Sequence, residues 1–148
     1  MICKVIVDES LEEDVVVRIK KENNLSKEIR RLVEDYSNEI ILYKDEEIVK
    51  TNISEVIAFT VSDNKVYAIT SFGKFVIKSR LYQLTEVVGD SFVKINQSCL
   101  INVNKIKKFK VSPFGGMYVV MNDGFTDYIS RRQLKTVKER LGLWWINI

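Results

Sequence analysis

The feature that most constrains this chain is a succession of short apolar, β-branched runs between residues 39 and 129. Runs of this length, bounded by turn-forming residues, predict antiparallel strands joined by tight connections. We therefore expect an α+β protein that is mainly β. The turn-forming groups between the runs are Asp63-Asn64, Phe72-Gly73-Lys74, Pro113-Phe114-Gly115-Gly116 and Asn122-Asp123-Gly124.

Three segments have helical spacing instead. Residues 26–38 place apolar side chains at i, i+3, i+4 and i+7 after Ser26, a candidate N-cap. Residues 79–89 and 130–142 begin at Ser79 and Ser130 and end at glycines, which predicts two further helices. The runs at 2–7 and 15–19 predict a pair of strands, so the N-terminus is expected to form a small β-β-α unit. Residues 98–106 are predicted to form a short helix or turn.

The composition argues against most enzyme classes. The chain of 148 residues has no histidine, the commonest general base and metal ligand. It also has no CxxC, GxGxxG or Walker pattern. Cys3 and Cys99 lie far apart in apolar sequence, so we expect two buried or half-buried thiols and no disulfide framework. We therefore expect no enzymatic activity, no metal and no cofactor. Without a long apolar run or a signal-peptide pattern, the expected location is the cytoplasm.

Positive charge is concentrated in the C-terminal part. Residues 1–45 carry 8 Lys+Arg and 11 Asp+Glu, a net charge of −3, whereas residues 46–148 carry 15 and 9, a net charge of +6. This asymmetry is typical of a polyanion-binding module. An ordinary solvated basic face explains the charge equally well, so charge alone does not decide between them.

Two basic clusters accompany residues that can read bases. Four lysines fall within residues 105–110, shortly after Asn96-Gln97, and a second cluster opens the helix that Ser130 is expected to cap. Asn and Gln can pair with adenine, and Arg132 could pair with guanine through two hydrogen bonds. The N-terminus of a helix also favours a phosphate. An amphipathic helix that merely covers a core would show the same basic spacing.

The segment FVKINQSCLINVNKIKKFK, followed after a hairpin by SRRQLK, resembles the LytTR DNA-binding domain of bacterial transcriptional regulators. The upstream segment EVIAFTVSDNKVYAITSFGKFVIKSRLYQLTE resembles the opening strands and first helix of that family. The resemblance covers residues 46–142. It implies an elongated, multi-stranded, mainly β fold with a helix after the third strand of the domain and a C-terminal helix. Such a fold reads successive major grooves of duplex DNA from loops and a helix start.

The resemblance also implies the contacts. The expected base contacts are Asn64, Asn96, Gln97 and Arg132. The expected phosphate contacts are Lys65, Lys94, Ser98, Lys105, Lys107, Lys108, Ser130, Arg131 and Lys135. Many members carry Arg-x-His-Arg where this chain has Lys94-x-Asn96-Gln97, so we expect a lower affinity per domain and more dependence on dimerisation. Asn102 also matches the family pattern, and we expect it to satisfy backbone groups at a turn.

The resemblance divides the chain at about residue 45. Residues 46–148 would form the DNA-binding domain, and residues 1–45 would serve dimerisation or partner binding, or would simply complete the fold. The partners expected are duplex DNA, a second copy of the chain in a homodimer, and a membrane protein that restrains the regulator, with no small-molecule substrate. Two rival functions stay open: a protein-interaction module that also uses the apolar tail at 143–146, and an RNA-binding domain whose aromatic side chains stack bases.

Overall fold

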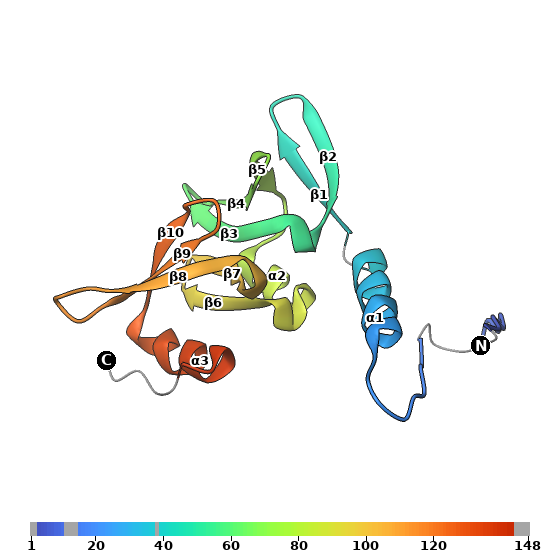
Figure 1. Ribbon diagram of the computed structural model, residues 1–148. Helices are drawn as coiled ribbons and strands as arrows, with labels where there is room; N and C mark the ends of the chain where they lie inside the picture. The colour runs from blue at the N-terminus through green and yellow to red at the C-terminus, as the bar shows by residue number, and fades with distance from the viewer. Residues whose placement is uncertain (1–2, 11–14, 38, 144–148) are drawn as a thin grey trace. The chain divides into compact units, whose positions relative to one another are not determined.

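The computed structural model describes residues 3–10, 15–37 and 39–143, and the chain divides into two compact units, Met1–Ser37 and Asn38–Ile148 (Figure 1). The division lies at residues 37 and 38, so residues 39–44, which the sequence assigned to the N-terminal unit, form a strand of the larger unit. The predictions for the tail at 144–148 lie outside the described residues.

In the described part of the smaller unit, residues 24–37 form helix α1 (Asn24–Ser37). Asn23 caps it: the Asn23 N–H donates to Ser26 Oγ and the Ser26 N–H donates to Asn23 Oδ1, both at 3.0 Å. Ser26 therefore lies inside the first turn and is not the cap that we predicted. The predicted strands are also wrong for the described residues 3–8 and 15–19, which are extended but unpaired. Their β-branched side chains favour a pleated surface, but no such surface forms here.

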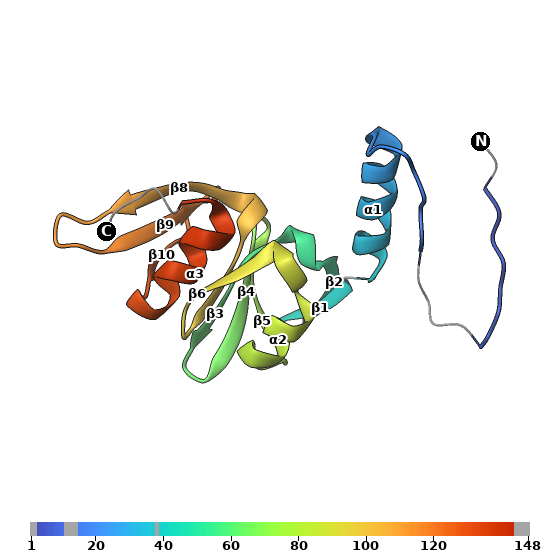
Figure 2. The same cartoon turned by 90° about the horizontal axis from the view of Figure 1, so that it is seen from below.

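Between residues 39 and 143, the larger unit is built from ten strands in two antiparallel sheets (Figure 2). The seven-stranded sheet has the order β2-β1-β5-β4-β3-β7-β6, and the three-stranded sheet has the order β10-β9-β8. The strands are β1 (Glu39–Lys44), β2 (Glu47–Asn52), β3 (Val56–Ser62), β4 (Lys65–Thr70), β5 (Gly73–Ile77), β6 (Phe92–Asn96), β7 (Cys99–Asn102), β8 (Ile106–Val111), β9 (Met117–Met121) and β10 (Thr126–Ile129).

Two helices complete this unit, and each packs on its own hydrophobic cluster. Helix α2 (Leu81–Val87) buries Leu84 in a cluster with Phe59, Phe75 and Phe92 from the seven-stranded sheet. Helix α3 (Arg131–Leu141) buries Val137 in a second cluster that joins β6 and β7 to the three-stranded sheet. Because neighbouring residues of a strand face opposite ways, the same strands supply both clusters.

The structure corrects the prediction for residues 98–106. Residues 99–102 form strand β7, paired with both β6 and β3, and a short 3-10 turn follows at Val103–Lys105. All four residues of β7 are buried, so the strand lacks the apolar–polar alternation that marks a half-exposed strand. Asn102 is structural, as predicted. Its amide donates to the carbonyls of Ser54 (3.2 Å) and Val56 (2.9 Å) and its oxygen accepts from the Asn104 N–H.

Candidate nucleic-acid interface

Asn64 lies at the tip of the tight turn between β3 and β4. Asp63 and Asn64 both have positive φ angles, 51° and 61°. Two consecutive residues of this kind make the two-residue hairpin turn that matches strand twist, and Asn and Asp tolerate the conformation well. The turn holds the Asn64 side chain out in solvent, where the structure shows it exposed.

At the turn between β6 and β7, the adjacent residues Asn96 and Gln97 differ in burial, which their similar side chains did not predict. Asn96 is only 2% exposed, and its amide donates to the Tyr128 carbonyl at 2.9 Å while its oxygen accepts from the Ser98 N–H at 2.9 Å. Asn96 is thus placed to hold the turn rather than to reach a base, which corrects its assignment as a base contact. Gln97 and Ser98 are exposed.

The start of α3 forms the third polar site. Ser130 is the N-cap in extended conformation, and its side chain makes no capping hydrogen bond. Its hydroxyl and the first N–H groups of the helix are therefore open to an external acceptor such as a phosphate. Arg131, Arg132 and Lys135 are all exposed in the first two turns.

Backbone hydrogen bonds fix these three sites side by side. The Val61 N–H, near the end of β3, donates to the Ser98 carbonyl at 2.8 Å. The Ser130 N–H donates to the Ile95 carbonyl, also at 2.8 Å. The β6–β7 turn is thereby joined on one side to the β3–β4 hairpin and on the other to the start of α3. Figure 1 shows the three along the same side of the larger unit. We call this side the reading edge and define it by Asn64, Gln97 and Arg132.

A basic groove adjoins the reading edge. It has a volume of about 800 Å³ and lies beside α2, with Asn64 and Gln97 in its lining. Four cationic side chains also line it: Lys65, Lys78, Arg80 and Lys94. Lys65 and Lys94 were predicted from the sequence, but Lys78 and Arg80 were not. The only sequence feature that could have indicated them is the pair of basic residues in Lys78-Ser79-Arg80, just before α2. This segment follows β5, which pairs with β4 and so lies next to it.

The lysines at 105–108 lie elsewhere. They come after the C-terminal end of β7, where Asn102 pairs with Phe92. The turn at Gln97 comes before the opposite end of the strand, where Cys99 pairs with Asn96. The length of β7, about 13 Å for four residues, separates Lys105 from the turn. Lys107 and Lys108 are exposed on β8, and Lys105 is half-buried. The structure therefore does not bring this cluster to the reading edge.

Glu86 is the one carboxylate among the described residues that line the groove, and it forms no ion pair with the cations there. The ion pairs within the described residues are Arg30–Glu22, Arg31–Glu28 and Lys50–Glu39, and none of them involves this region. Arg140 has a structural role: its guanidinium donates to the carbonyls of Phe92 and Asp90, both at 2.7 Å, and so ties the end of α3 to the start of β6.

The buried thiol and the polar groups give no sign of catalytic chemistry in the described part. Burial raises the pKa of the Cys99 thiol far above its usual value, and the negative charge of Asp127 adds to this effect. Cys99 is therefore an inert core thiol, as expected. Cys3 is exposed, so the prediction that it is at least half-buried is wrong. Among the described residues, no group of three His, Cys, Asp or Glu side chains is placed to hold a metal ion. Nor is any helix in those ranges long and apolar enough to cross a membrane.

Comparison with known proteins connects this geometry to a family. The family model of the LytTr DNA-binding domain matches residues 46–142. The chain belongs to the LytTr DNA-binding domain family. A protein of Staphylococcus aureus strain NCTC 8325 / PS 47, named an uncharacterized HTH-type transcriptional regulator, is 39% identical over 109 residues, or 74% of each chain. A protein of the same name from the bovine strain RF122 / ET3-1 is 38% identical over 109 residues.

A solved structure confirms the predicted LytTr fold class. The LytTr DNA-binding domain from Bacillus cereus matches with a TM-score of 0.67 at 21% identity, covering 71% of this chain and 97% of that domain. The Staphylococcus aureus relatives carry the name HTH-type. In the described part of this LytTr chain, however, strands separate every α-helix from the next, so no helix-turn-helix is present.

Proposed function

We propose that this LytTr protein binds duplex DNA in a sequence-specific manner and regulates transcription. The observation that carries the proposal is the reading edge, where three exposed polar side chains on three different elements are held in a row by backbone hydrogen bonds. Family membership and the names of the Staphylococcus aureus relatives support the same function.

Each of the three side chains of the reading edge can form hydrogen bonds to a base edge in the major groove. The Gln97 and Asn64 amides can donate to and accept from the N7 and N6 positions of adenine. The Arg132 guanidinium can donate two hydrogen bonds to the O6 and N7 positions of guanine. The buried Asn96 side chain would help base recognition indirectly, because its hydrogen bond to the Tyr128 carbonyl fixes the Gln97 turn to β10.

The surrounding cations would hold the phosphates. In the basic groove these are Lys65, Lys94, Lys78 and Arg80. At the helix start, Arg131, Lys135 and the open hydroxyl of Ser130 would hold a further phosphate, with Ser98 beside them. Lys105, Lys107 and Lys108 would contact DNA only where the duplex extends past the reading edge.

The regulator would act in the cytoplasm, as a homodimer on repeated half-sites, without a cofactor. The short footprint of one reading edge supports the dimer, since a few base contacts supply only part of the discrimination that a genome demands. We further propose that a membrane protein restrains the regulator until a signal releases it, as the family resemblance implies.

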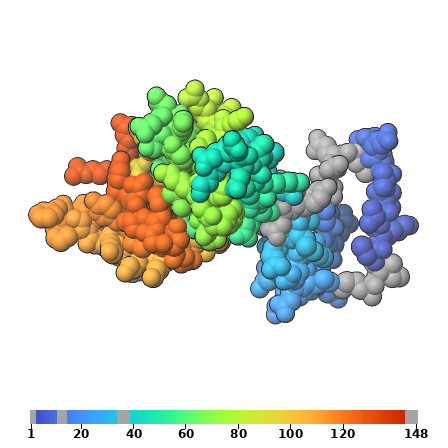
Figure 3. Space-filling view, turned by 90° about the horizontal axis from the view of Figure 1, so that it is seen from above, coloured from blue at the N-terminus to red at the C-terminus, as the bar shows by residue number. Residues whose placement is uncertain are grey.

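RNA binding by aromatic stacking is the weaker alternative. Phe109 and Phe125 pack against the hydrophobic cluster beneath α3 and are not available to stack bases. Phe114, at 99% exposure, lies in the turn of the β8–β9 hairpin, which projects from the larger unit in Figure 3, while Tyr118 and Tyr128 are partly exposed. A single-stranded competitor in the binding assay tests this alternative directly.

The experiment is selection from a random duplex library over a salt series, followed by sequencing of the retained DNA. An enriched repeated motif, with affinity that falls steeply as salt rises, is expected. Arg132→Gln should lose preference at one position of the motif, by about 1–3 kcal/mol, while its affinity for random duplex stays near that of the wild type. Salt-dependent binding without any motif, or equal binding of single strands, would contradict the proposal.

A further inference from the structure

The described residues of the smaller unit form no hydrophobic core of their own. Every described side chain between residues 3 and 33 is exposed or half-buried. Val5, Ile6 and Val7 are 82%, 73% and 88% exposed. Chains shorter than roughly 40 residues usually need a metal, disulfides or oligomerisation to fold, and this unit has 37 residues. Its apolar surface therefore needs another surface to cover it.

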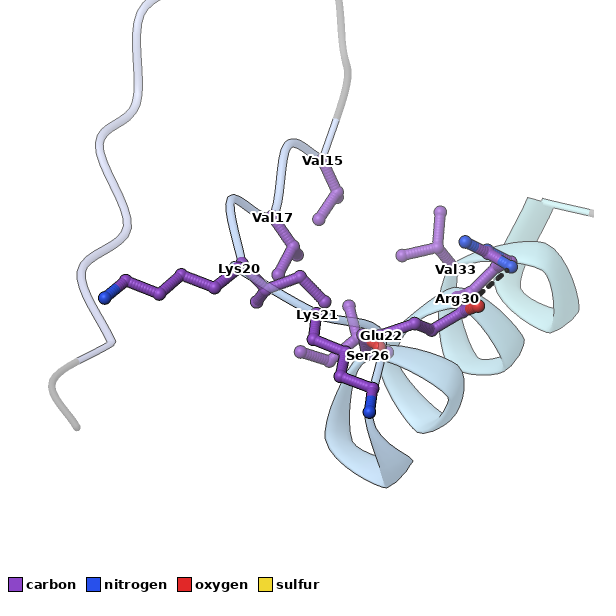
Figure 4. Close-up of a pocket in the computed structure, with 10 residues that line it drawn as sticks. Val15, Val17, Lys20, Lys21, Glu22, Ser26, Arg30 and Val33 are labelled. Atoms are coloured by element: carbon purple, nitrogen blue, oxygen red, sulfur yellow. Dashed lines mark ion pairs between the residues drawn. The ribbon is translucent and has the colours of Figure 1, made fainter.

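The unit also presents a groove, between the extended segment at 15–22 and α1. The groove has a volume of about 520 Å³. Val15, Val17 and Ile19, which share one face of the extended segment, line it together with Ile29 and Val33 of α1 (Figure 4).

Two lysines also line the groove. Lys20 and Lys21 follow Ile19 in the extended segment, and Figure 4 shows their side chains pointing in different directions. Among the described residues, Arg30 is paired with Glu22 at 3.1 Å, whereas neither lysine belongs to an ion pair (Figure 4). The groove therefore combines an apolar lining with a net positive charge, and it suits a segment with apolar residues followed by acidic ones.

The two extended segments have unused backbone hydrogen-bonding groups. Among the described residues, no backbone–backbone hydrogen bond involves residues 3–7 or 15–19. Extended β-branched runs with free N–H and C=O groups are templates for strand pairing with another chain. Residues 3–9, Cys-Lys-Val-Ile-Val-Asp-Glu, have the order that the groove requires, with apolar side chains first and two carboxylates after them.

We propose that residues 3–9 of one copy occupy the groove of a second copy, and that the exchange is reciprocal. Val5 and Val7 cover the apolar lining, and Asp8 and Glu9 meet Lys20 and Lys21. In the single chain these valines remain exposed, so the chain does not fill its own groove. A reciprocal exchange closes after two copies and gives a twofold dimer. The inference deepens the proposed function, because it names the interface of the dimer that would bind repeated half-sites.

The experiment measures the mass and dissociation constant of the full chain by sedimentation equilibrium in the absence of DNA. The wild type should form a dimer, twice the chain mass of 17.2 kDa. Val17→Asp, in the groove, should weaken the dimer by about a hundredfold or more, because a carboxylate would be buried against apolar side chains. Val16→Asp is the matched control, since Val16 is 67% exposed and lies outside the groove lining.

Charge reversal provides a second test that misfolding cannot imitate. Asp8→Lys with Glu9→Lys, and Lys20→Glu with Lys21→Glu, should each weaken the dimer by about tenfold, and the four substitutions together should restore it. A monomeric wild type at 100 µM would overturn the inference. So would a dimer that Val17→Asp and Val16→Asp affect equally, or a charge combination without rescue. Loss of DNA binding by an intact dimer would instead count against the proposed function alone.

Discussion

Asn96 offers the sharpest test of the distinction between side chains that contact DNA bases and side chains that stabilise the turn. The substitution Asn96→Ala removes a donor to the Tyr128 carbonyl and an acceptor for the Ser98 N–H, both at 2.9 Å. Each hydrogen bond contributes about 1 kcal/mol, and leaving the Tyr128 carbonyl without its partner costs about 1 kcal/mol more. We therefore expect the free energy of unfolding to fall by about 3 kcal/mol.

The assay is urea unfolding of the full chain, followed by far-ultraviolet circular dichroism. The matched control is Gln97→Ala, since Gln97 is the exposed neighbour in the same turn. It should change the free energy of unfolding by less than about 0.5 kcal/mol while it lowers discrimination between DNA sequences. In thermal unfolding, the Asn96 variant should lose roughly 12 °C, at about 4 °C per kcal/mol for a unit of this size.

The opposite pattern would refute this distinction. If Asn96→Ala unfolded like the wild type but lost its preference for particular DNA sequences, the side chain would be reading a base. The buried arrangement would then not be the one that binds DNA. Equal losses of stability in both variants would show instead that the whole turn, and not the Asn96 amide, stabilises this region.

Three further predictions follow from the same geometry. Lys78→Gln should reduce the slope of log affinity against log salt by about 0.9, because one phosphate contact is lost, whereas Lys50→Gln should leave it unchanged, since Lys50 pairs with Glu39 away from the groove. Titration of the Cys3→Ser variant with a thiol reagent at pH 8 should show no reaction until the chain unfolds, because the raised pKa and burial of Cys99 keep it protonated and inaccessible; a fast reaction in the folded state would contradict this. Arg140→Ala should lower the free energy of unfolding by about 1–3 kcal/mol, measured in urea, since two charged hydrogen bonds to backbone carbonyls are lost.

Much of the larger unit could be predicted from its sequence because local signals agree with the fold there. Asp63-Asn64 forms the expected hairpin turn, with both residues in the left-handed conformation. Leu134, Val137 and Leu141 recur at helical spacing in the sequence, and they form the inner face of α3. In such regions turn chemistry and periodicity indicate the same structure, so a single sequence is sufficient.

Where the sequence was insufficient, long-range pairing decided the structure. Strand β7 is buried on both faces between β3 and β6, so its apolar run has no alternation to identify it. Asn96 and Gln97 are chemically similar neighbours, and the register shift between Lys94 and Asn96 turns one inward and leaves the other outside. Lys78 and Arg80 reach the basic groove only because β5 pairs with β4. Residues 3–8 and 15–19 have strand propensity but pair with no strand among the described residues.

The backbone bonds that hold the reading edge also affect how such a protein can evolve. Because the turn at Gln97 and the start of α3 are fixed by main-chain groups, the side chains of Gln97 and Arg132 contribute little to folding. Either can be exchanged to change the preferred DNA sequence without loss of the scaffold. Asn64 is different: its φ of 61° restricts the position to Asn, Asp or Gly. Target preference at two of the three positions can therefore drift freely, while the third is limited by the turn that presents it.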